Sequence, residues 1–401
     1  MKLAFLTHEP FYPPSAGGST EAVYLVQELV RRGHQVHLFC PDFPDAESTA
    51  KKFGVDLRAF TTWRMGRYTS LRNFKYLAFP FFLQRLVERE AKRTRFDVVL
   101  SQHAISAVTA GRLRKRLGTP VIMNFLDYLT GFMETWPRYV APSPLIRALK
   151  QFELSLPGRY RADGVLTVSD TLADYFAGAG YPRERLLSIY YGYDAQRFPF
   201  SERTGAGEPR SPVVVMHGSF DYHHLGPIAL DALRVVVASR PETRFRFVGR
   251  ETPVLMRFRE RARETIHGVQ IDCTGFVPYE EMAAQLSDAS VGIVPYEEST
   301  GAHCAFVAKI VEYLGVGLPV VSTPLRSAKR YFSDESAVHF SEFDGESFGK
   351  QILEWLTESV ENRRSLGRTA SDRVRRDLDW RALSKKAIDF VEKIAQQQRD
   401  T

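Results

Sequence analysis

Short apolar runs and amphipathic stretches alternate along the first half of the chain. The runs have the length of buried strands, and they lie at Lys2–Leu6, Gln35–Cys40, Val98–Ser101, Val121–Phe125 and Gly164–Val168. The stretch after the first run has its apolar residues on one helical face, at Ala22, Leu25, Val26, Leu29 and Val30. This alternation predicts a parallel sheet covered by helices on both faces.

The same alternation restarts after a break near residue 200. A segment rich in Gly and Pro interrupts the pattern, and we predict a linker at 199–212. The elements expected beyond it are strands at Val213–His217, Arg244–Val248, Val291–Val294 and Val320–Ser322, and helices at Ile228–Ser239, Glu280–Leu286, Ala305–Val316 and Trp380–Gln397. The sequence therefore predicts two domains, 1–198 and 213–379, with a helix at 380–398 that packs back on the first domain.

Two such domains predict an α/β protein with two facing, doubly wound Rossmann-like sheets and an interdomain cleft. The chain has 401 residues, which is long enough for two hydrophobic cores. Ligands of doubly wound sheets bind beyond the carboxyl ends of the strands. We therefore expect the loops that follow the strands to hold the substrates.

Cysteine usage and the apolar segments predict a cytoplasmic protein. The three cysteines are Cys40, Cys273 and Cys304, and their spacing matches neither a disulfide scaffold nor a metal site. The first residues read as a strand rather than as a signal peptide. The most apolar run, Tyr76–Leu83, is too short to span a bilayer, which takes about 20 residues.

The net charge of +7 is concentrated in the first 200 residues. A basic half suits an anionic partner, such as membrane lipid, a phosphorylated acceptor or nucleic acid, or it is an ordinary solvated surface. Basic residues flank the run Tyr76–Leu83, at Arg64, Arg67, Arg72, Lys75, Arg85, Arg89, Lys92, Arg93 and Arg95. This pattern is typical of an interfacial helix on anionic lipid. Pro80 counts against it, and a surface helix packed on the first domain is the alternative.

The segment Glu297–Thr323 carries the most informative polar residues. We predict a loop at Ser299–His303 leading into a helix, whose free N–H groups suit a diphosphate. Lys309 and Glu312 are three residues apart and share a helix face, where the lysine can neutralise phosphate and the carboxylate can accept ribose hydroxyls. On spacing alone, a surface ion pair worth roughly a few tenths of a kcal/mol is the better interpretation.

The wider sequence around this pair resembles the donor-binding signature of GT-B glycosyltransferases, especially retaining glycosyltransferase family 4 (glycosyl transferases group 1). Lys309 opens the motif K-x-x-E-Y-x-x-x-G-x-P-V-V. Further similar segments occur in the family's order, and they are the glycine pair at 17–18, ELVRRGHQVHLFC, FDVVLSQ, ADGVLTVSD and YYGYDAQRF. The similarity covers nearly the whole chain, and this ordered set favours a donor site over a surface ion pair.

The resemblance implies roles for residues on the donor side. Glu312 would bind the ribose hydroxyls, and Lys309 would approach the diphosphate. Gly17 and Gly18 would let backbone come close to the donor phosphate or sugar, or they form an ordinary turn. The diphosphate would lie near Gly218, Ser219 and Phe220. The base would be framed by Phe276 and Val277, for which core packing is the alternative.

One departure from the family pattern leaves the sugar half of the donor site open. The family often has a glutamate eight residues before the position of Glu312, and this chain has Cys304 there. His303 or the backbone of Thr300 and Gly301 would then replace that contact, or the donor sugar differs. A catalytic role for Cys304 is disfavoured, because no partner base is visible in the sequence.

Three further candidates come directly after predicted strands. Asp127 follows Val121–Phe125, where a carboxylate can orient the acceptor hydroxyl or stabilise positive charge at the sugar, or can cap a helix. His8 follows the first strand and is a catalytic candidate or a structural histidine. The basic residues that the family has after the Gly218 strand are absent, and Arg250 is a candidate for the missing charge or a surface arginine.

The resemblance implies a glycosyltransferase that moves a sugar from a nucleoside-diphosphate donor to a hydroxyl of a glycan, a lipid-linked sugar or a small molecule. It also implies retention at the anomeric carbon, with no cofactor and no catalytic metal. The alternatives are a nucleotide-sugar epimerase on the same fold and a non-catalytic nucleotide-sugar-binding relative. A dinucleotide oxidoreductase is disfavoured, since no G-x-G-x-x-G follows the first strand. No nucleic-acid partner is expected, because nucleic-acid binding would not explain the motif that contains Lys309 and Glu312. Contact with the inner face of the membrane is the open alternative for the basic half.

Overall fold

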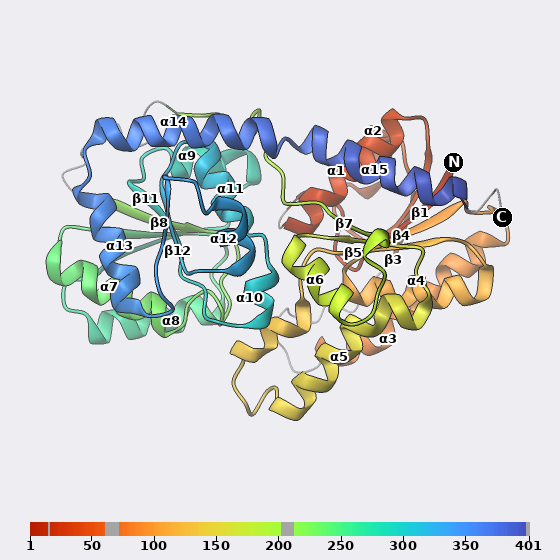
Figure 1. Cartoon of the computed structure of the whole chain (residues 1–401), viewed down its shortest axis with the longest axis horizontal. Coiled ribbons are helices and arrows are strands. Elements are labelled where there is room, and N and C mark those ends of the chain that lie inside the picture. Colours follow the sequence, from red (N-terminus) through yellow and green to blue (C-terminus); the bar gives the residue numbers. More distant parts are fainter. Residues whose placement is uncertain (15–16, 61–71, 202–211, 398–401) are drawn as a thin grey trace. The chain divides into compact units, whose positions relative to one another are not determined.

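The computed structural model describes residues 1–14, 17–60, 72–201 and 212–397 (Figure 1). The chain divides into two compact units. The first contains Met1–Leu129, Arg147–Tyr190 and Arg381–Thr401, and the second contains Thr130–Ile146 and Tyr191–Trp380. Most of the predicted linker at 199–212 lies outside the described residues.

The first unit is built on a parallel sheet of seven strands in the order β3-β2-β1-β4-β5-β6-β7. The strands are β1 Lys2–Leu6, β2 Gln35–Pro41, β3 Asp56–Phe60, β4 Val98–Gln102, β5 Val121–Phe125, β6 Gly164–Thr167 and β7 Leu186–Ser188. The helices of this part of the chain are α1 Gly17–Arg31, α2 Ala46–Phe53, α3 Arg72–Ala91, α4 His103–Leu117, α5 Ser143–Tyr160, α6 Asp170–Gly178 and α15 Trp380–Gln397, with 3₁₀ turns η1 Leu129–Thr135 and η2 Arg183–Arg185. Strands β4, β5 and β6 are buried along their whole length, as expected for a parallel sheet covered on both faces.

The second unit is built on a parallel sheet of six strands in the order β10-β9-β8-β11-β12-β13. The strands are β8 Val213–His217, β9 Arg244–Val248, β10 Gln270–Gly275, β11 Val291–Val294, β12 Val320–Ser322 and β13 Val338–Phe340. The helices are α7 Pro227–Ser239, α8 Pro253–Thr265, α9 Met282–Leu286, α10 Thr300–Cys304, α11 Ala308–Gly315, α12 Arg326–Phe332, α13 Gly345–Thr357 and α14 Val360–Asp377, with the 3₁₀ turn η3 Tyr279–Glu281. The prediction of two doubly wound parallel sheets is confirmed.

The strand prediction missed the edges of the two sheets. The edge strands β3, β7, β10 and β13 have no uninterrupted apolar run, because one side of an edge strand meets solvent and carries polar residues. The predicted helix Ala305–Val316 was also wrong at its start. The chain forms the short helix α10, then an extended stretch from Ala305 whose φ is −67° and ψ 135°, and only then α11.

The residues just before the predicted linker belong to the second unit rather than to the first. The backbone N–H of Tyr193 donates to the carbonyl of Leu378, and Trp380 N–H donates back to the carbonyl of Tyr193. The Tyr193 ring also fills the space beside Gly315, where a Cβ would lie only 1.9 Å from it. These contacts hold 191–198 against α11 and the end of α14.

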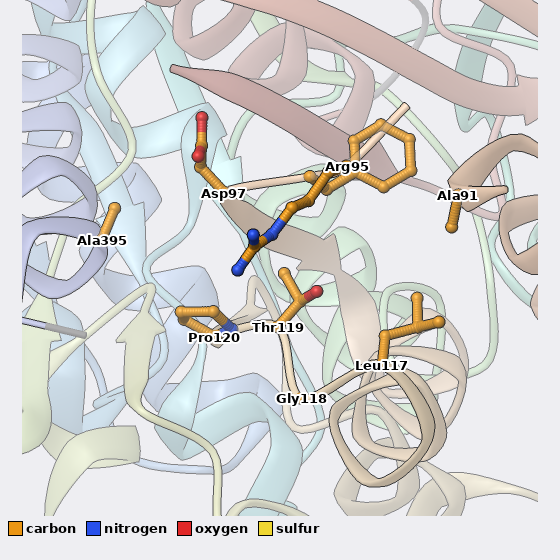
Figure 2. A pocket seen from close by; sticks show the side chains of 9 residues that line it. Ala91, Arg95, Asp97, Leu117, Gly118, Thr119, Pro120 and Ala395 are labelled. Atoms are coloured by element: carbon orange, nitrogen blue, oxygen red, sulfur yellow. The ribbon is translucent and has the colours of Figure 1, made fainter. Parts of the chain in front are cut away.

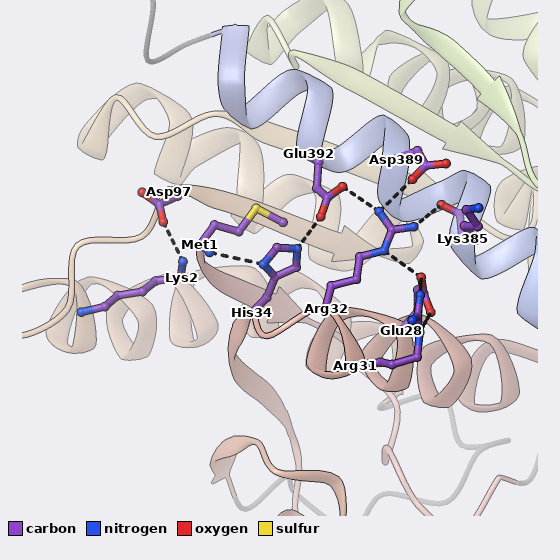
Figure 3. Close-up of polar contacts among 10 residues, drawn as sticks. All are labelled: Met1, Lys2, Glu28, Arg31, Arg32, His34, Asp97, Lys385, Asp389 and Glu392. Carbon is purple, nitrogen blue, oxygen red and sulfur yellow. Dashed lines mark hydrogen bonds and ion pairs between the residues drawn. The ribbon is translucent and has the colours of Figure 1, made fainter.

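The tail helix α15 lies against α1 and the start of the first sheet (Figure 3). Arg32 at the end of α1 donates to Glu392 at 2.6 Å and pairs with Asp389 at 2.7 Å. The His34 ring lies 2.7 Å from the same Glu392 carboxylate, and its other nitrogen lies 3.3 Å from the amino terminus of Met1. Polar contacts therefore join the end of α1 and the chain start to this helix.

Helix α3 continues through Pro80 rather than ending there. One face packs inward, with Phe79 and Leu83 buried, while Phe81 and Phe82 are about half exposed, at 52% and 50%. Arg64 and Arg67 lie outside the described residues. None of the helices in the described part of the chain is long and apolar enough to cross a membrane.

A hollow of about 720 Å³ opens at the amino ends of β4 and β5 (Figure 2). Its lining includes Arg95 and Asp97 before β4, and Thr119 and Pro120 before β5. This edge of the sheet is opposite to the one at which doubly wound folds bind ligands. The hollow therefore does not coincide with any predicted site residue.

Candidate functional site

The main polar constellation of the second unit lies at the switch point of its sheet. Strands β8 and β11 are neighbours there, while the chain runs outward in opposite directions from them. At such a point the two following loops part and leave room for a ligand. His217 ends β8, Tyr296 comes just after β11, and helix α11 supplies Lys309 and Glu312.

Glu312 is buried and already has three polar neighbours. Its Oε1 accepts hydrogen bonds from the hydroxyls of Tyr279 at 2.9 Å and Tyr191 at 3.0 Å. Its Oε2 lies 3.1 Å from Nε2 of His217. Burial raises the pKa of Glu312 to about 7, against the opposing effects of the two tyrosines and Lys309. A ribose that binds this carboxylate must therefore compete with at least one tyrosine hydroxyl.

Lys309 is buried one helical turn before Glu312. Its Nζ donates to the hydroxyl of Tyr296 at 3.2 Å, and the same hydroxyl lies 3.0 Å from Nε2 of His224. Burial and the Lys309 charge together lower the pKa of His217 to about 3, so His217 is neutral at physiological pH. Lys309 is thus the positive charge within this group of side chains.

Gly218 lets the end of the Lys309 side chain lie close to the backbone after β8. Its φ is +104°, which favours glycine, and a Cβ there would lie 3.3 Å from Nζ of Lys309. Gly249 approaches from the next strand, where a Cβ would lie 2.1 Å from the carbonyl oxygen of Gly218. Backbone rather than side chains therefore lines this side of the lysine.

The other predicted donor residues of this unit fall into an exposed and a buried set. Arg250 is exposed, and its guanidinium lies 4.6 Å from the centre of the Phe276 ring, which is itself 51% exposed. Ser219 is exposed and Val277 half-buried. Phe220 is fully buried against Phe247, and its ring also lies beside Gly249, so it serves packing.

The predicted loop Ser299–His303 is instead the short helix α10. Ser299 caps it by accepting the N–H of Ala302 at 3.0 Å. Thr300 does not offer a free N–H, because that group donates to the Glu134 carboxylate at 2.6 Å. His303 is buried, with Nδ1 accepting from the N–H of Arg326 at 3.3 Å. Burial lowers the pKa of His303.

Gly301 is needed for packing between α10 and the η1 turn. A Cβ at Gly301 would lie 2.4 Å from the backbone nitrogen of Phe132. The Phe132 ring packs in turn on His223, with the ring centres 4.5 Å apart. The segment Thr130–Ile146 thereby forms part of the second unit, which the sequence pattern did not predict.

The first unit brings four predicted residues, His8, Gly17, Gly18 and Asp127, to the carboxyl ends of β1 and β5. Gly17 and Gly18 begin α1 rather than forming a loop. A Cβ at Gly18 would lie 2.6 Å from Nε2 of His103, and the His8 and His103 rings are 4.8 Å apart. His103, at the start of α4, is therefore the centre of this group, although the sequence analysis did not name it.

Charge within this group is balanced around His103. Burial alone would lower its pKa, but Glu9, Asp127 and Glu21 outweigh burial and raise it. Nε2 of His103 lies 3.7 Å from Oε2 of Glu9. The φ of His103 is +67°, an uncommon conformation for a residue with a side chain, and such strain is often found at functional sites.

A buried carboxyl, Glu21, lies behind this group. Its Oε2 accepts from Asn124 at 2.8 Å and from Gln102 at 3.1 Å. Burial raises the pKa of Glu21 to about 7, against the effects of these two bonds and of His103. The available signal in the sequence was the polar residue Asn124 inside the apolar strand β5, and the polar pair Gln102–His103 where β4 ends and α4 begins.

The tyrosines around Glu312 and Lys309 were also missed. Tyr191 and Tyr279 bond Glu312, whereas Tyr296 bonds Lys309. The three come from separate segments, and only the fold brings them to this pair. Within the described ranges, no group of three or more His, Cys, Asp or Glu side chains is arranged to hold a metal ion.

Two family models match consecutive parts of the chain. Residues 16–197 match the model described as Glycosyltransferase Family 4, and residues 211–358 match the one described as Glycosyl transferases group 1. One relative is the protein of Salmonella typhimurium provisionally named colanic acid biosynthesis glycosyltransferase WcaL. It is 24% identical over 242 residues, which cover 58% of this chain and 57% of the relative. The match thus spans little more than half the length of that relative.

Solved structures share the fold over almost the whole chain. Sucrose-phosphate synthase of Thermosynechococcus elongatus matches with a TM-score of 0.79 and 15% identity over 98% of both chains. HepE of Anabaena, solved in complex with UDP-glucose, matches with a TM-score of 0.73 and 15% identity, over 98% of this chain and all of that chain (100%). At such identities the likeness establishes the fold alone.

The two family models match in succession over most of the length of the chain. The chain therefore belongs to the GT-B glycosyltransferases related to family 4.

Proposed function

We propose that the protein transfers a sugar from a nucleoside-diphosphate sugar to an acceptor hydroxyl. The observation that carries this proposal is the pair Lys309 and Glu312 at the switch point of the second sheet, within the family's donor motif. The lysine is buried beside a glycine turn that leaves room for phosphate, and the carboxylate lies one helical turn further on. This arrangement suits a ligand with a diphosphate at one end and a diol at the other.

Each residue of the proposed site has a role that follows from its chemistry. Glu312 accepts the ribose hydroxyls once a tyrosine hydroxyl gives way, and Lys309 neutralises charge on the leaving diphosphate, where fixed electrostatic stabilisation contributes most. Arg250 and Phe276 form an exposed platform on which a base can stack. In the first unit, Asp127, His8 and His103 are candidates to orient the acceptor. We propose retention at the anomeric carbon, as in family 4.

The donor class is supported by the related folds. HepE, which shares the fold, was solved with UDP-glucose. The alternatives are a nucleotide-sugar epimerase and a non-catalytic binding protein, and neither needs an acceptor. Product analysis separates the three activities, because only a transferase forms a new glycosidic bond.

A thermal-shift screen of nucleotide sugars followed by product analysis tests the function. We expect one nucleoside-diphosphate sugar to raise the melting temperature, and its incubation with acceptors to release the nucleoside diphosphate with a glycosylated product. We also expect the rate to be unchanged by EDTA, since no metal or other cofactor is proposed. Binding without turnover on any acceptor would favour the non-catalytic alternative, and isomerised donor without acceptor would favour the epimerase.

We further propose that the acceptor is a glycan, a lipid-linked sugar or a small molecule, and that the protein is cytoplasmic with contact to an anionic membrane face. The exposed Phe81 and Phe82 on α3, with Arg85 and Arg89 following on the same helix, support the membrane contact. Flotation with vesicles rich in phosphatidylglycerol should recover the protein at low salt and lose it at high salt. Absence of salt-sensitive binding would refute the contact.

A further inference from the structure

His223 occupies a fixed position in the loop that follows β8. Its carbonyl accepts the N–H of Glu297 at 2.9 Å, which holds the loop against the chain after β11. Its ring lies against that of His224, with the centres 3.8 Å apart and the planes tilted by 40°. The rings of Phe132 and Tyr296 pack on it with centre-to-centre distances of 4.5 and 5.3 Å. The imidazole therefore has little freedom to turn toward solvent.

The ring of His223 carries an unused polar atom. Its Nδ1 is buried and has no hydrogen-bond partner among the residues that the structure describes. Burial and the nearby Lys309 charge lower the pKa of His223 to about 3, so this histidine is neutral at physiological pH. Buried polar atoms without partners are uncommon in proteins, and each calls for an explanation such as a ligand.

The two neighbouring histidines lie against other polar groups. Nε2 of His217 is 3.1 Å from Oε2 of Glu312, although the two atoms form no hydrogen bond. In His224, Nδ1 accepts the N–H of Asp221 at 3.0 Å and Nε2 lies 3.0 Å from the Tyr296 hydroxyl. His223 is thus the histidine of this loop with a ring nitrogen available to a ligand.

Among the charged groups around His223, Lys309 is the one that lowers its pKa, in addition to the larger effect of burial. On its own loop, Asp221 accepts the N–H of Tyr222. From the loop after β11, the Glu297 carboxylate accepts the N–H of Ile228 at 2.9 Å. From η1, Glu134 is bonded to Thr300. None of these carboxylates contributes to the shift in the His223 pKa, whereas Lys309 on α11 does.

We propose that His223 takes up a proton when a diphosphate binds beside Lys309, and so supplies a second positive charge next to the diphosphate. This inference rests on the proposed donor site. An anion at Lys309 reverses the local field, because an opposite charge within a few ångströms favours the charged imidazole. The pKa of His223 then rises on binding, so binding is accompanied by proton uptake.

The consequence is a donor site that adapts its charge to its ligand. A neutral nucleoside leaves His223 uncharged, whereas a diphosphate gains a charge-assisted hydrogen bond. Since the bound pKa is the higher one, affinity for the diphosphate weakens as pH rises through that bound value. Glu312 acts in the opposite sense, because its carboxyl must lose a proton to accept ribose hydroxyls, and it does so with uridine as well as with UDP.

Calorimetric titration of UDP and of uridine at pH 6, in two buffers of different ionisation enthalpy, tests the inference. The wild type should take up more protons with UDP than with uridine. His223→Gln should abolish this difference and weaken UDP binding about tenfold, while uridine affinity is unchanged. His267→Gln, an exposed histidine between α8 and β10, serves as the matched control.

The outcomes separate the two proposals. A wild type that binds neither UDP nor any other nucleoside diphosphate of the screen overturns the donor site itself, and the inference with it. If UDP binds and His223→Gln keeps the same affinity and proton uptake, the donor site stands and the role of His223 is wrong. Thermal melting of each variant without ligand confirms that a loss of binding is not a loss of folding.

Discussion

Replacing Glu312 with Gln is expected to weaken nucleotide binding about 10- to 100-fold while leaving the protein folded. The amide oxygen can still accept the hydroxyls of Tyr191 and Tyr279, and the amide N–H group can face His217. The amide has one acceptor oxygen where the carboxylate has two, so the ribose diol loses an acceptor even when a tyrosine gives way. Equilibrium titration with the nucleoside diphosphate chosen by the screen measures the loss.

Glu312→Ala should lose about 100-fold or more, but it also leaves two buried tyrosine hydroxyls without their acceptor. Part of its effect will therefore be on stability, and the Gln variant is the cleaner test. Glu335→Gln is a matched control, because Glu335 is a buried carboxylate of the same unit that precedes β13 and pairs with Arg373. Nucleotide affinity unchanged in Glu312→Gln would refute the ribose role.

Replacing Lys309 with Met should lower kcat/KM about 100- to 1000-fold, the loss typical of removing one group that stabilises transition-state charge. The Nζ of Lys309 lies beside the glycine turn at Gly218, where the diphosphate is proposed to bind. Met has a similar length and fits a buried site. The Tyr296 hydroxyl would keep its contact with His224, so the fold should survive.

The comparison of ligands makes the Lys309 prediction specific. A nucleoside should bind Lys309→Met as well as it binds the wild type, whereas the diphosphate should lose affinity. Lys329→Met, on the exposed side of α12, is the control for removal of a positive charge from the same unit. Equal losses for nucleoside and diphosphate would show that Lys309 holds the structure rather than the phosphate.

Central strands of both sheets could be predicted from the sequence because burial on both faces demands apolar residues throughout. Strands β1, β5, β8, β9, β11 and β12 begin and end where the pattern placed them. The edge strand β10 alternates with polar residues and gives no such signal. The start of α11 was misplaced for a different reason, because apolar residues at Ala305–Val307 suit a helix and an extended stretch equally.

Site residues were predictable only where one local segment carries them. Lys309 and Glu312 lie on one helix turn, and their spacing with the following Gly317 forms a recognisable motif. His103 and His223 follow strands but belong to no motif that the sequence analysis used, so only their packing revealed them. Thr300 is a residue that the sequence did name but whose predicted role the structure does not support. Its backbone N–H, which we expected to be available to the donor, donates to Glu134.

The sequence by itself determined the two doubly wound sheets, the family and the lysine–glutamate pair, because these depend on periodicity and on spacing within single segments. Only the tertiary structure decided that Glu312 is buried under Tyr191 and Tyr279, with a pKa near 7. It also decided that His223 lies within the influence of Lys309. Protonation and hydrogen-bond competition depend on distances between residues far apart in the chain, which the order of residues does not express.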